Sequence, residues 1–163
     1  MRAMDAATGA ALAALMRRGR VAALGTLRDG APNVSMVAYL PEADFSALWM
    51  RLSRLAWHTQ DLARDARVSL AILQADDGRA DPQTLARVTL RGEAAEMPPD
   101  GPQFMILKNA WLARFPQSAV TFELADFAFW SVAVRDARFV AGLGRTHNLS
   151  AADLARAAQP LTD

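Results

Sequence analysis

The densest run of polar side chains in the sequence lies in residues 52–62, which read LSRLAWHTQDL. Ser53 is a helix-capping residue type, and apolar residues follow it at three- and four-residue steps, so we expect a helix from Ser53 to about Arg64. The free N–H groups and the dipole at a helix start favour an anion, and Arg54 adds a forked cation. His58 follows Arg54 by one turn on the same face. This segment predicts a phosphate site.

Two residues outside this segment are candidates for the same site. Ser35 lies on an expected second strand and Arg87 on an expected fifth strand, and both side chains could approach from the barrel wall. The alternative is a plain serine cap beside a solvated arginine and a hydrogen-bonded histidine. From the residues alone that alternative is favoured, because helix caps are far more common than phosphate sites.

Composition excludes several classes of function. The sequence contains no cysteine, which removes disulfides, Cys-based zinc sites, iron–sulfur ligation and thiol nucleophiles. Redox chemistry would therefore need a bound cofactor. The 18 basic and 17 acidic residues give a net charge of +1 and are spread along the chain, which argues against nucleic-acid binding.

Neither a membrane span nor a signal peptide is expected. No apolar run approaches the roughly 18 residues that a membrane helix needs. The apolar stretch at residues 6–16 resembles a signal peptide only superficially, because Asp5 precedes it and arginines follow it at once. We therefore expect a cytoplasmic protein with no membrane contact.

The elements expected to position these residues form one domain over residues 1–163. An N-terminal helix is expected at about residues 5–18, a barrel at about 20–145 and a short C-terminal helix at about 150–158. Gly19 is expected to end the first helix in a left-handed conformation. The expected strands are 21–27, 34–40, 47–52, 68–73, 86–96, 127–135 and 138–141, with a second core helix at 104–115. This order is typical of a mainly β protein, an antiparallel barrel with peripheral α-helices.

Several of these segments together resemble a known family. The segments are Ser35-Met36-Val37, residues 52–62, Arg67-Val68-Ser69-Leu70 and residues 86–92, followed later by residues 114–116, 126–127 and 139–145. They resemble the pyridoxamine 5′-phosphate oxidase-like family, whose fold is the FMN-binding split β-barrel, and within it the haem-utilisation branch. The similarity covers about residues 18 to 150.

The resemblance implies a homodimer of split barrels with two FMN molecules in the grooves between subunits. The cofactor-binding residues that it implies are Ser35, Ser53, Arg54, Trp57, His58, Thr59 and Arg87. Trp57 would face the cofactor or the dimer interface. Trp57 and His58 occupy the places where the oxidases carry a basic pair, and Ser35 and Leu40 stand where they carry Arg and Lys. The phosphate of FMN would therefore meet fewer cations here.

Three functions remain open from the sequence. The first is an FMN-dependent oxidoreductase that acts on an unidentified small molecule, with no catalytic residue assigned. The oxidases' substrate-binding Arg- and His-bearing segment has no counterpart in residues 130–143, which argues against vitamin B6 oxidation. The second is a haem-binding or haem-degrading protein with His147 as the iron ligand and Arg145 near a propionate. The third is a barrel without cofactor that serves as a non-catalytic interaction dimer.

Overall fold

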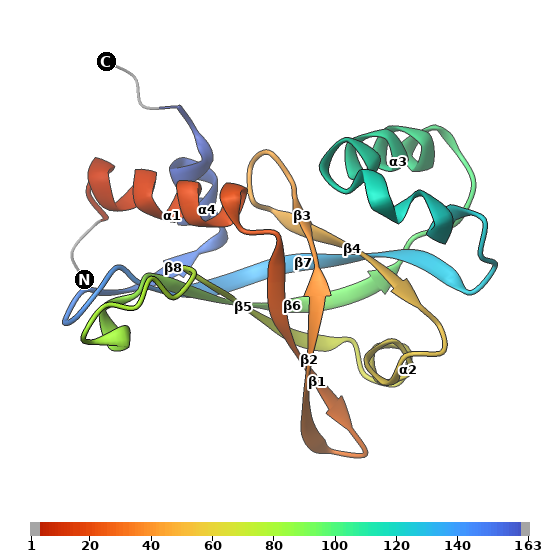
Figure 1. Ribbon diagram of the computed structural model, residues 1–163, viewed down its shortest axis with the longest axis horizontal. Coiled ribbons are helices and arrows are strands. Elements are labelled where there is room, and N and C mark those ends of the chain that lie inside the picture. The colour runs from red at the N-terminus through yellow and green to blue at the C-terminus, as the bar shows by residue number, and fades with distance from the viewer. Residues whose placement is uncertain (1–3, 161–163) are drawn as a thin grey trace.

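An eight-stranded antiparallel sheet, curled into a half-barrel, forms the body of the chain in the computed structural model, which describes residues 4–160 (Figure 1). The strands are β1 (Val21–Arg28), β2 (Ala31–Ala38), β3 (Leu40–Pro41), β4 (Ala47–Ser53), β5 (Arg67–Leu73), β6 (Arg87–Glu96), β7 (Phe127–Val140) and β8 (Thr146–Ser150). Their order is β2-β1-β5-β6-β7-β4-β3, and β8 pairs with the half of β7 that β4 leaves free. The predicted mainly β, antiparallel split-barrel class is confirmed.

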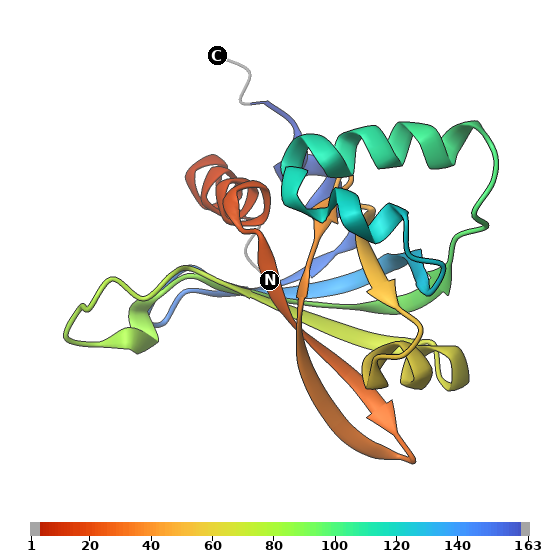
Figure 2. The same ribbon diagram turned by 45° about the vertical axis from the view of Figure 1, so that its right-hand side comes forward.

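Four α-helices and two short 3₁₀ helices surround the sheet in the described residues. They are α1 (Ala6–Arg18), α2 (Trp57–Arg64), α3 (Pro102–Arg114), α4 (Ala151–Ala158), η1 (Pro82–Thr84) and η2 (Pro116–Phe122). Helices α1 and α4 lie side by side at one end, α3 covers β4, and α2 lies beside the β1–β2 hairpin at the other end (Figures 1 and 2). The helices expected near both termini and at 104–115 are confirmed. Within residues 4–160, no helix has the length and apolar character needed to span a membrane.

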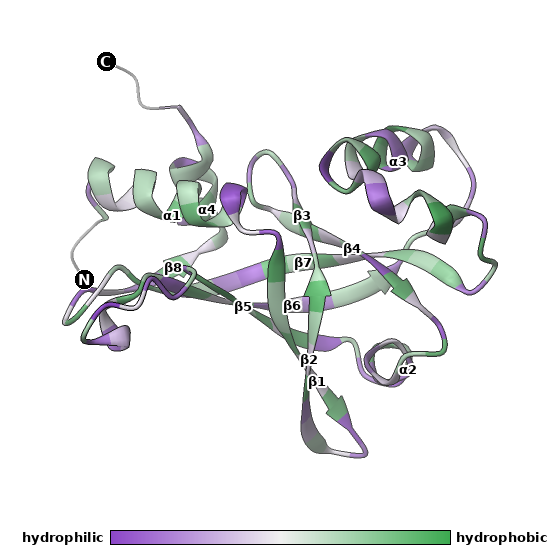
Figure 3. Ribbon diagram, viewed as in Figure 1, coloured by the Kyte–Doolittle hydropathy of each residue, from purple (hydrophilic) through white to green (hydrophobic). Residues whose placement is uncertain are grey.

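The hairpin of β1 and β2 follows directly from its turn residues. Asp29 and Gly30 both have positive φ, at 51° and 80°, which is the conformation that a two-residue hairpin turn requires. The register places Gly25 opposite Val34 and Thr26 opposite Asn33, so alternate residues face the barrel interior. Hydrophobic residues run along both strands, as Figure 3 shows.

Strand β7 is continuous where the sequence predicts a break at Asp136. It pairs with β6 from Trp130 to Val140, across the predicted break, because the register shifts by one residue between Arg91 and Gly92. A Cβ on Gly92 would lie 2.0 Å from the Ala133 carbonyl oxygen, so only glycine fits this bulge. The predicted pair of strands is therefore wrong, and one long strand links both ends of the half-barrel.

Gly19 also differs from its prediction. Its backbone is extended, with φ of −61°, and a Cβ there would lie 2.4 Å from the hydroxyl of Tyr39. Close packing rather than a left-handed turn therefore explains the glycine.

Inside the half-barrel one core joins the strands to α1 and α4, and a second cluster under α3 contains Trp49, Leu107, Trp111, Phe115 and Phe129.

Candidate functional site

Ser53 does not open a helix, so the predicted helix start is wrong. It is the last residue of β4, paired with Phe127 of β7, and α2 begins four residues later at Trp57. Its hydroxyl donates to Asp126 Oδ2 at 2.5 Å and accepts from the backbone N–H of Leu55 at 3.1 Å. Pairing with β7 extends β4 through this residue and outweighs the local capping tendency.

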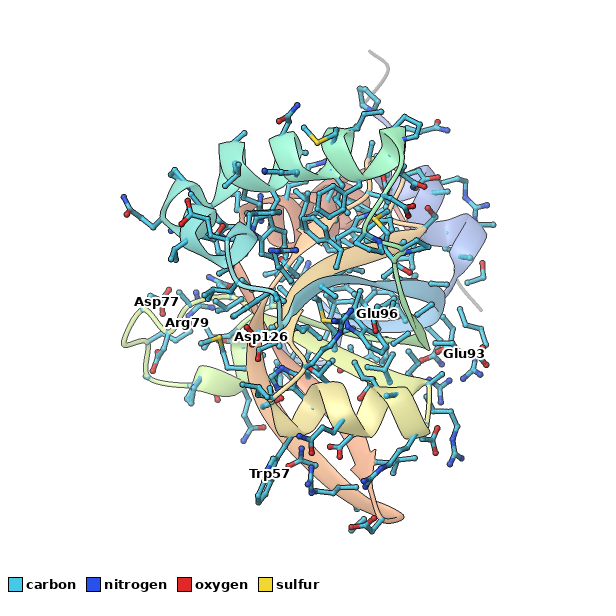
Figure 4. The ribbon with its side chains drawn as sticks, turned by 90° about the vertical axis from the view of Figure 1, so that its right-hand side faces the viewer. Trp57, Asp77, Arg79, Glu93, Glu96 and Asp126 are labelled. Atoms are coloured by element: carbon cyan, nitrogen blue, oxygen red, sulfur yellow. The ribbon has the colours of Figure 1, made fainter. Side chains whose placement is uncertain are left out.

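Arg54 lies in the turn after β4 rather than on the helix. Its Nη2 contacts Glu96 Oε1 at 2.6 Å, and its side chain is 53% exposed. The backbone N–H of Arg54 donates to the Asp126 carbonyl at 2.7 Å, which holds the turn against the start of β7. In Figure 4, Asp126 and Glu96 lie above α2 and Trp57 lies below it. Arg54 and His58 therefore do not share a helix face as predicted.

The start of α2 has no side-chain cap among the described residues. Ala56 occupies the N-cap position with an extended backbone, at φ of −72° and ψ of 143°, and no side chain hydrogen-bonds there. The N–H groups of a first helical turn have no partner within the helix, and together with the dipole they favour an anion. The helix therefore has an uncapped start, at Ala56 rather than at the predicted Ser53, and anion binding there stays a prediction.

Two buried hydroxyls, one on β2 and one on α2, have no hydrogen-bond partner within residues 4–160. They are Oγ of Ser35 on β2 and Oγ1 of Thr59 in the first turn of α2; Thr59 is only 3% exposed. Ser35 is two residues from Asn33 and shares its face of the strand, and Asn33 reaches Asp61 of α2. Because an unpaired buried hydroxyl is costly, these two groups are candidate hydrogen-bond donors to a ligand.

His58 is half-buried in the first turn of α2. Burial lowers its pKa below the ordinary 6.5, and the Asp61 carboxylate only partly offsets this effect. The imidazole is consequently neutral at pH 7 and can donate or accept a hydrogen bond without supplying a cation. His58 therefore adds no positive charge to a site where few cations are expected.

Asp61 is a residue that the sequence analysis missed. Its carboxylate is buried at 1% exposure and accepts from Thr26 Oγ1 at 2.8 Å, Arg28 Nη1 at 2.9 Å and Asn33 Nδ2 at 3.1 Å. The Arg28 guanidinium carbon lies 4.2 Å from the centre of the Trp57 ring, which is otherwise 64% exposed. The available signal was an acidic residue one turn after Trp57 within an amphipathic helix.

Arg87 and His147 are not brought to α2 within one chain. Arg87 opens β6 and donates to the carbonyls of Gln83 and Leu85 at 2.9 and 3.2 Å. Glu96, beside Arg54, lies at the other end of this ten-residue strand, about 30 Å away at the usual rise per residue. His147 lies on β8, where it lines a cavity of about 600 Å³ with Arg145 and residues of α1 and α4.

Comparison with known proteins gives one family and several related structures. The sequence pattern of the family described as pyridoxamine 5′-phosphate oxidase matches residues 8–141. The structure of a heme binding protein from Mycobacterium smegmatis is 30% identical, with a TM-score of 0.80, and the match covers 96% of this chain and 62% of that one. No curated protein matches the chain.

Two more distant structures share the fold. HutZ, the heme storage protein from Vibrio cholerae, is 17% identical with a TM-score of 0.69, over 77% of this chain and 88% of that one. An FAD-binding protein from Mesorhizobium loti is 18% identical with a TM-score of 0.64, over 83% of this chain and 92% of that one. At these identities the likeness extends to the fold alone.

Proposed function

Because the chain belongs to the pyridoxamine 5′-phosphate oxidase family, we propose that it binds FMN with the phosphate at the start of α2 and acts as an oxidoreductase on a small molecule. One observation carries the proposal. The start of α2 has no side-chain cap, its first turn carries the buried hydroxyl of Thr59, and the buried hydroxyl of Ser35 lies two residues from Asn33, which contacts α2; neither hydroxyl has a partner in the described structure. A phosphate accepts hydrogen bonds both from the backbone N–H groups of a helix start and from side-chain hydroxyls.

The residues present fit a phosphate that is held by dipoles more than by full charges. Ser35 and Thr59 would donate from their hydroxyls, the first turn of α2 would donate from its backbone, and neutral His58 would donate from its ring. A bound flavin supplies the two-electron chemistry that a cysteine-free chain lacks. The predicted roles of Ser53 and Arg54 at the cofactor stay predictions, since both side chains already have carboxylate partners.

Titration with FMN and with riboflavin, which lacks the phosphate, tests this proposal. The purified chain should bind FMN more tightly, and Ser35→Ala and Thr59→Val should each reduce that preference by about tenfold, the effect of losing one hydrogen bond to a charged group. Ser46→Ala, directly before β4, removes an exposed hydroxyl and serves as the matched control. Equal affinity of the wild-type chain for the two flavins would refute the phosphate site.

We also propose that a second copy of the chain covers the open face of the sheet. This face consists of the outward residues of β2, β1 and β5. In the middle of this face, small residues of β1 and β5 lie opposite one another across the two strands. Large hydrophobic side chains flank them, with Val34 at 70%, Met36 at 69% and Leu73 at 56% exposure. Contiguous exposed apolar surface of this kind marks an interaction site. In a homodimer, Arg87 of one copy could serve a cofactor bound at α2 of the other.

Light scattering tests the homodimer directly. The wild-type chain should have twice the mass of one protomer at micromolar concentration, and Met36→Glu should shift it to monomer because a buried, unpaired carboxylate opposes association. Ile106→Glu, at an exposed position on α3, is the matched control and should leave the mass unchanged. A wild-type monomer at high concentration would contradict the dimer.

Haem binding at His147 is the second candidate function. The observation that favours it is the cavity of about 600 Å³ that His147 lines together with Arg145, a cation suited to a propionate. Titration with hemin should give an intense Soret band in the wild-type chain that His147→Ala removes and His58→Ala retains. The same band in both variants would exclude His147 as the ligand.

A chain that binds neither FMN nor hemin would instead support the non-catalytic interaction dimer. The small-molecule substrate and its catalytic residues stay unassigned, because no side chain of the described site is placed for acid–base or nucleophilic chemistry on a known substrate. The cytoplasmic location stays a prediction from the sequence.

A further inference from the structure

Asp61 joins α2 to the β1–β2 hairpin through one buried carboxylate. All three of its side-chain donors come from the hairpin: Thr26 and Arg28 on β1, and Asn33 on β2. Both carboxylate oxygens are used, Oδ1 by Arg28 and Oδ2 by Thr26 and Asn33. The helix is therefore tied to both strands that form the wall where Ser35 lies.

Arg28 extends this connection to the first residue of α2. Its guanidinium carbon lies 4.2 Å from the centre of the Trp57 ring, and its Nη1 contacts the Trp57 carbonyl oxygen at 3.4 Å. Asp61 lies one helical turn after Trp57, so a single guanidinium contacts two successive turns of the helix. The hairpin thereby contacts α2 at the turn whose free N–H groups form the proposed phosphate site.

Helix α2 depends on such contacts for its position. It has eight residues and no side-chain cap, and isolated helices shorter than about 12 residues are marginal in water. A buried ion pair adds little net stability compared with apolar residues of the same shape. The contribution of this pair to the stability of the fold is accordingly small, and its contacts with α2 leave a role in positioning the helix.

We propose that Asp61 is a positioning residue, which holds the start of α2 against the hairpin so that its N–H groups and the hydroxyls of Ser35 and Thr59 act on one phosphate. This inference rests on the proposed function and deepens it. Arg28 neutralises the buried carboxylate, so that the network positions the helix without placing a net negative charge beside the phosphate.

A charge-neutral double variant tests the positioning role. Arg28→Met with Asp61→Asn removes one charge of each sign, so a change in phosphate binding cannot arise from net charge. Arg67→Met with Asp65→Asn is the matched control, because this pair, at 2.6 Å, lies at the other end of α2 and neither of its side chains is fully buried. We expect the first variant to lower the preference for FMN over riboflavin about tenfold, and the control to leave it unchanged.

The outcomes separate the two proposals. A wild-type chain without any preference for FMN overturns both the phosphate site and the positioning role. A wild-type preference that survives in the Arg28/Asp61 variant, or that falls equally in the control, overturns the positioning role alone. A merely structural network would lower the melting temperature and leave the ratio of affinities unchanged. If the double variant does not fold, Thr26→Val, which removes one donor, should lower the ratio about threefold.

Discussion

Helix termini are capped at one end of the half-barrel, whereas at the other end a helix starts without a side-chain cap in the described residues. At the α1–α4 end, Asp5 caps α1, and Ser150 and Asp153 form a reciprocal capping box on α4. The last carbonyls of α1 accept hydrogen bonds from Tyr39 and Arg114. At the other end, α2 starts at Ala56 without a side-chain cap.

Buried side-chain hydroxyls also differ between the two ends, being hydrogen-bonded at the α1–α4 end and unpartnered in the described residues near α2. Burial raises the pKa of Tyr39 to about 12, so its hydroxyl stays a donor to the Met16 carbonyl at 2.8 Å. Thr59 and Ser35, by contrast, keep hydroxyls that have no partner in the part of the chain that the structure describes. These polar groups at the α1–α4 end are satisfied within the fold, whereas the α2 end keeps donors without partners among the described residues. The following predictions test that contrast.

Removal of Arg114 should have the largest effect. Its guanidinium donates to the carbonyls of Tyr39 at 3.2 Å and Arg17 at 3.0 Å, and also to that of Gly19. Arg114→Met should lower the free energy of unfolding by about 2 to 3 kcal/mol, because these carbonyls lose charged donors. Urea denaturation measures this loss. The preference for FMN over riboflavin should not change, and a change would show that the two ends are coupled.

Two buried threonines should respond with opposite signs. Thr26→Val removes a hydroxyl bonded to Asp61 and should destabilise the ligand-free fold by about 1 to 2 kcal/mol. Thr59→Val removes an unpartnered hydroxyl and should stabilise it by about 1 kcal/mol, while FMN binding weakens. Urea denaturation of the two variants without flavin checks the signs. Destabilisation by Thr59→Val would mean that its hydroxyl is already satisfied.

A side-chain cap added at the start of α2 should stabilise the ligand-free chain and weaken its binding of FMN. Ala56→Asp should stabilise the ligand-free chain by about 0.5 to 1 kcal/mol, as N-caps do, and should abolish the preference for FMN because its carboxylate occupies and repels the phosphate position. Ser150→Ala at α4 is the reverse comparison and should cost about 1 kcal/mol without affecting flavin binding. Thermal unfolding and flavin titration measure both. A phosphate preference retained in Ala56→Asp would place the ligand elsewhere.

The smallest expected effect concerns pH. The pKa of His58 is lowered in the folded chain, so its contribution to stability is complete above about 6.5, its unfolded value, and is lost as the pH falls through and below it. His58→Gln should flatten this acid-side loss. NMR titration of the two histidines should place the pKa of His58 below 6.5 in the free chain, and FMN should raise it. A normal pKa for His58 would contradict its burial.

Much of the architecture follows from local sequence patterns. The expected strands at 21–27 and 34–40 form the β1–β2 hairpin, the expected strand at 86–96 forms β6, and the expected helix at about 150–158 forms α4. These elements are confirmed because backbone preferences over two to ten residues decide them. The strand β8, at residues 146–150, was missed because its short polar sequence forms a strand only through pairing with β7.

The site itself depended on contacts between distant residues. The sequence by itself determined the types of donor present, namely hydroxyls, an imidazole and a helix rich in polar residues. Only the tertiary structure decided which donors stay free: pairing of β4 with β7 brings the Ser53 hydroxyl to Asp126, and the Arg54 guanidinium donates to Glu96. The physical reason is that a donor is available to a ligand only when no folded neighbour satisfies it, and those neighbours are set by the sheet.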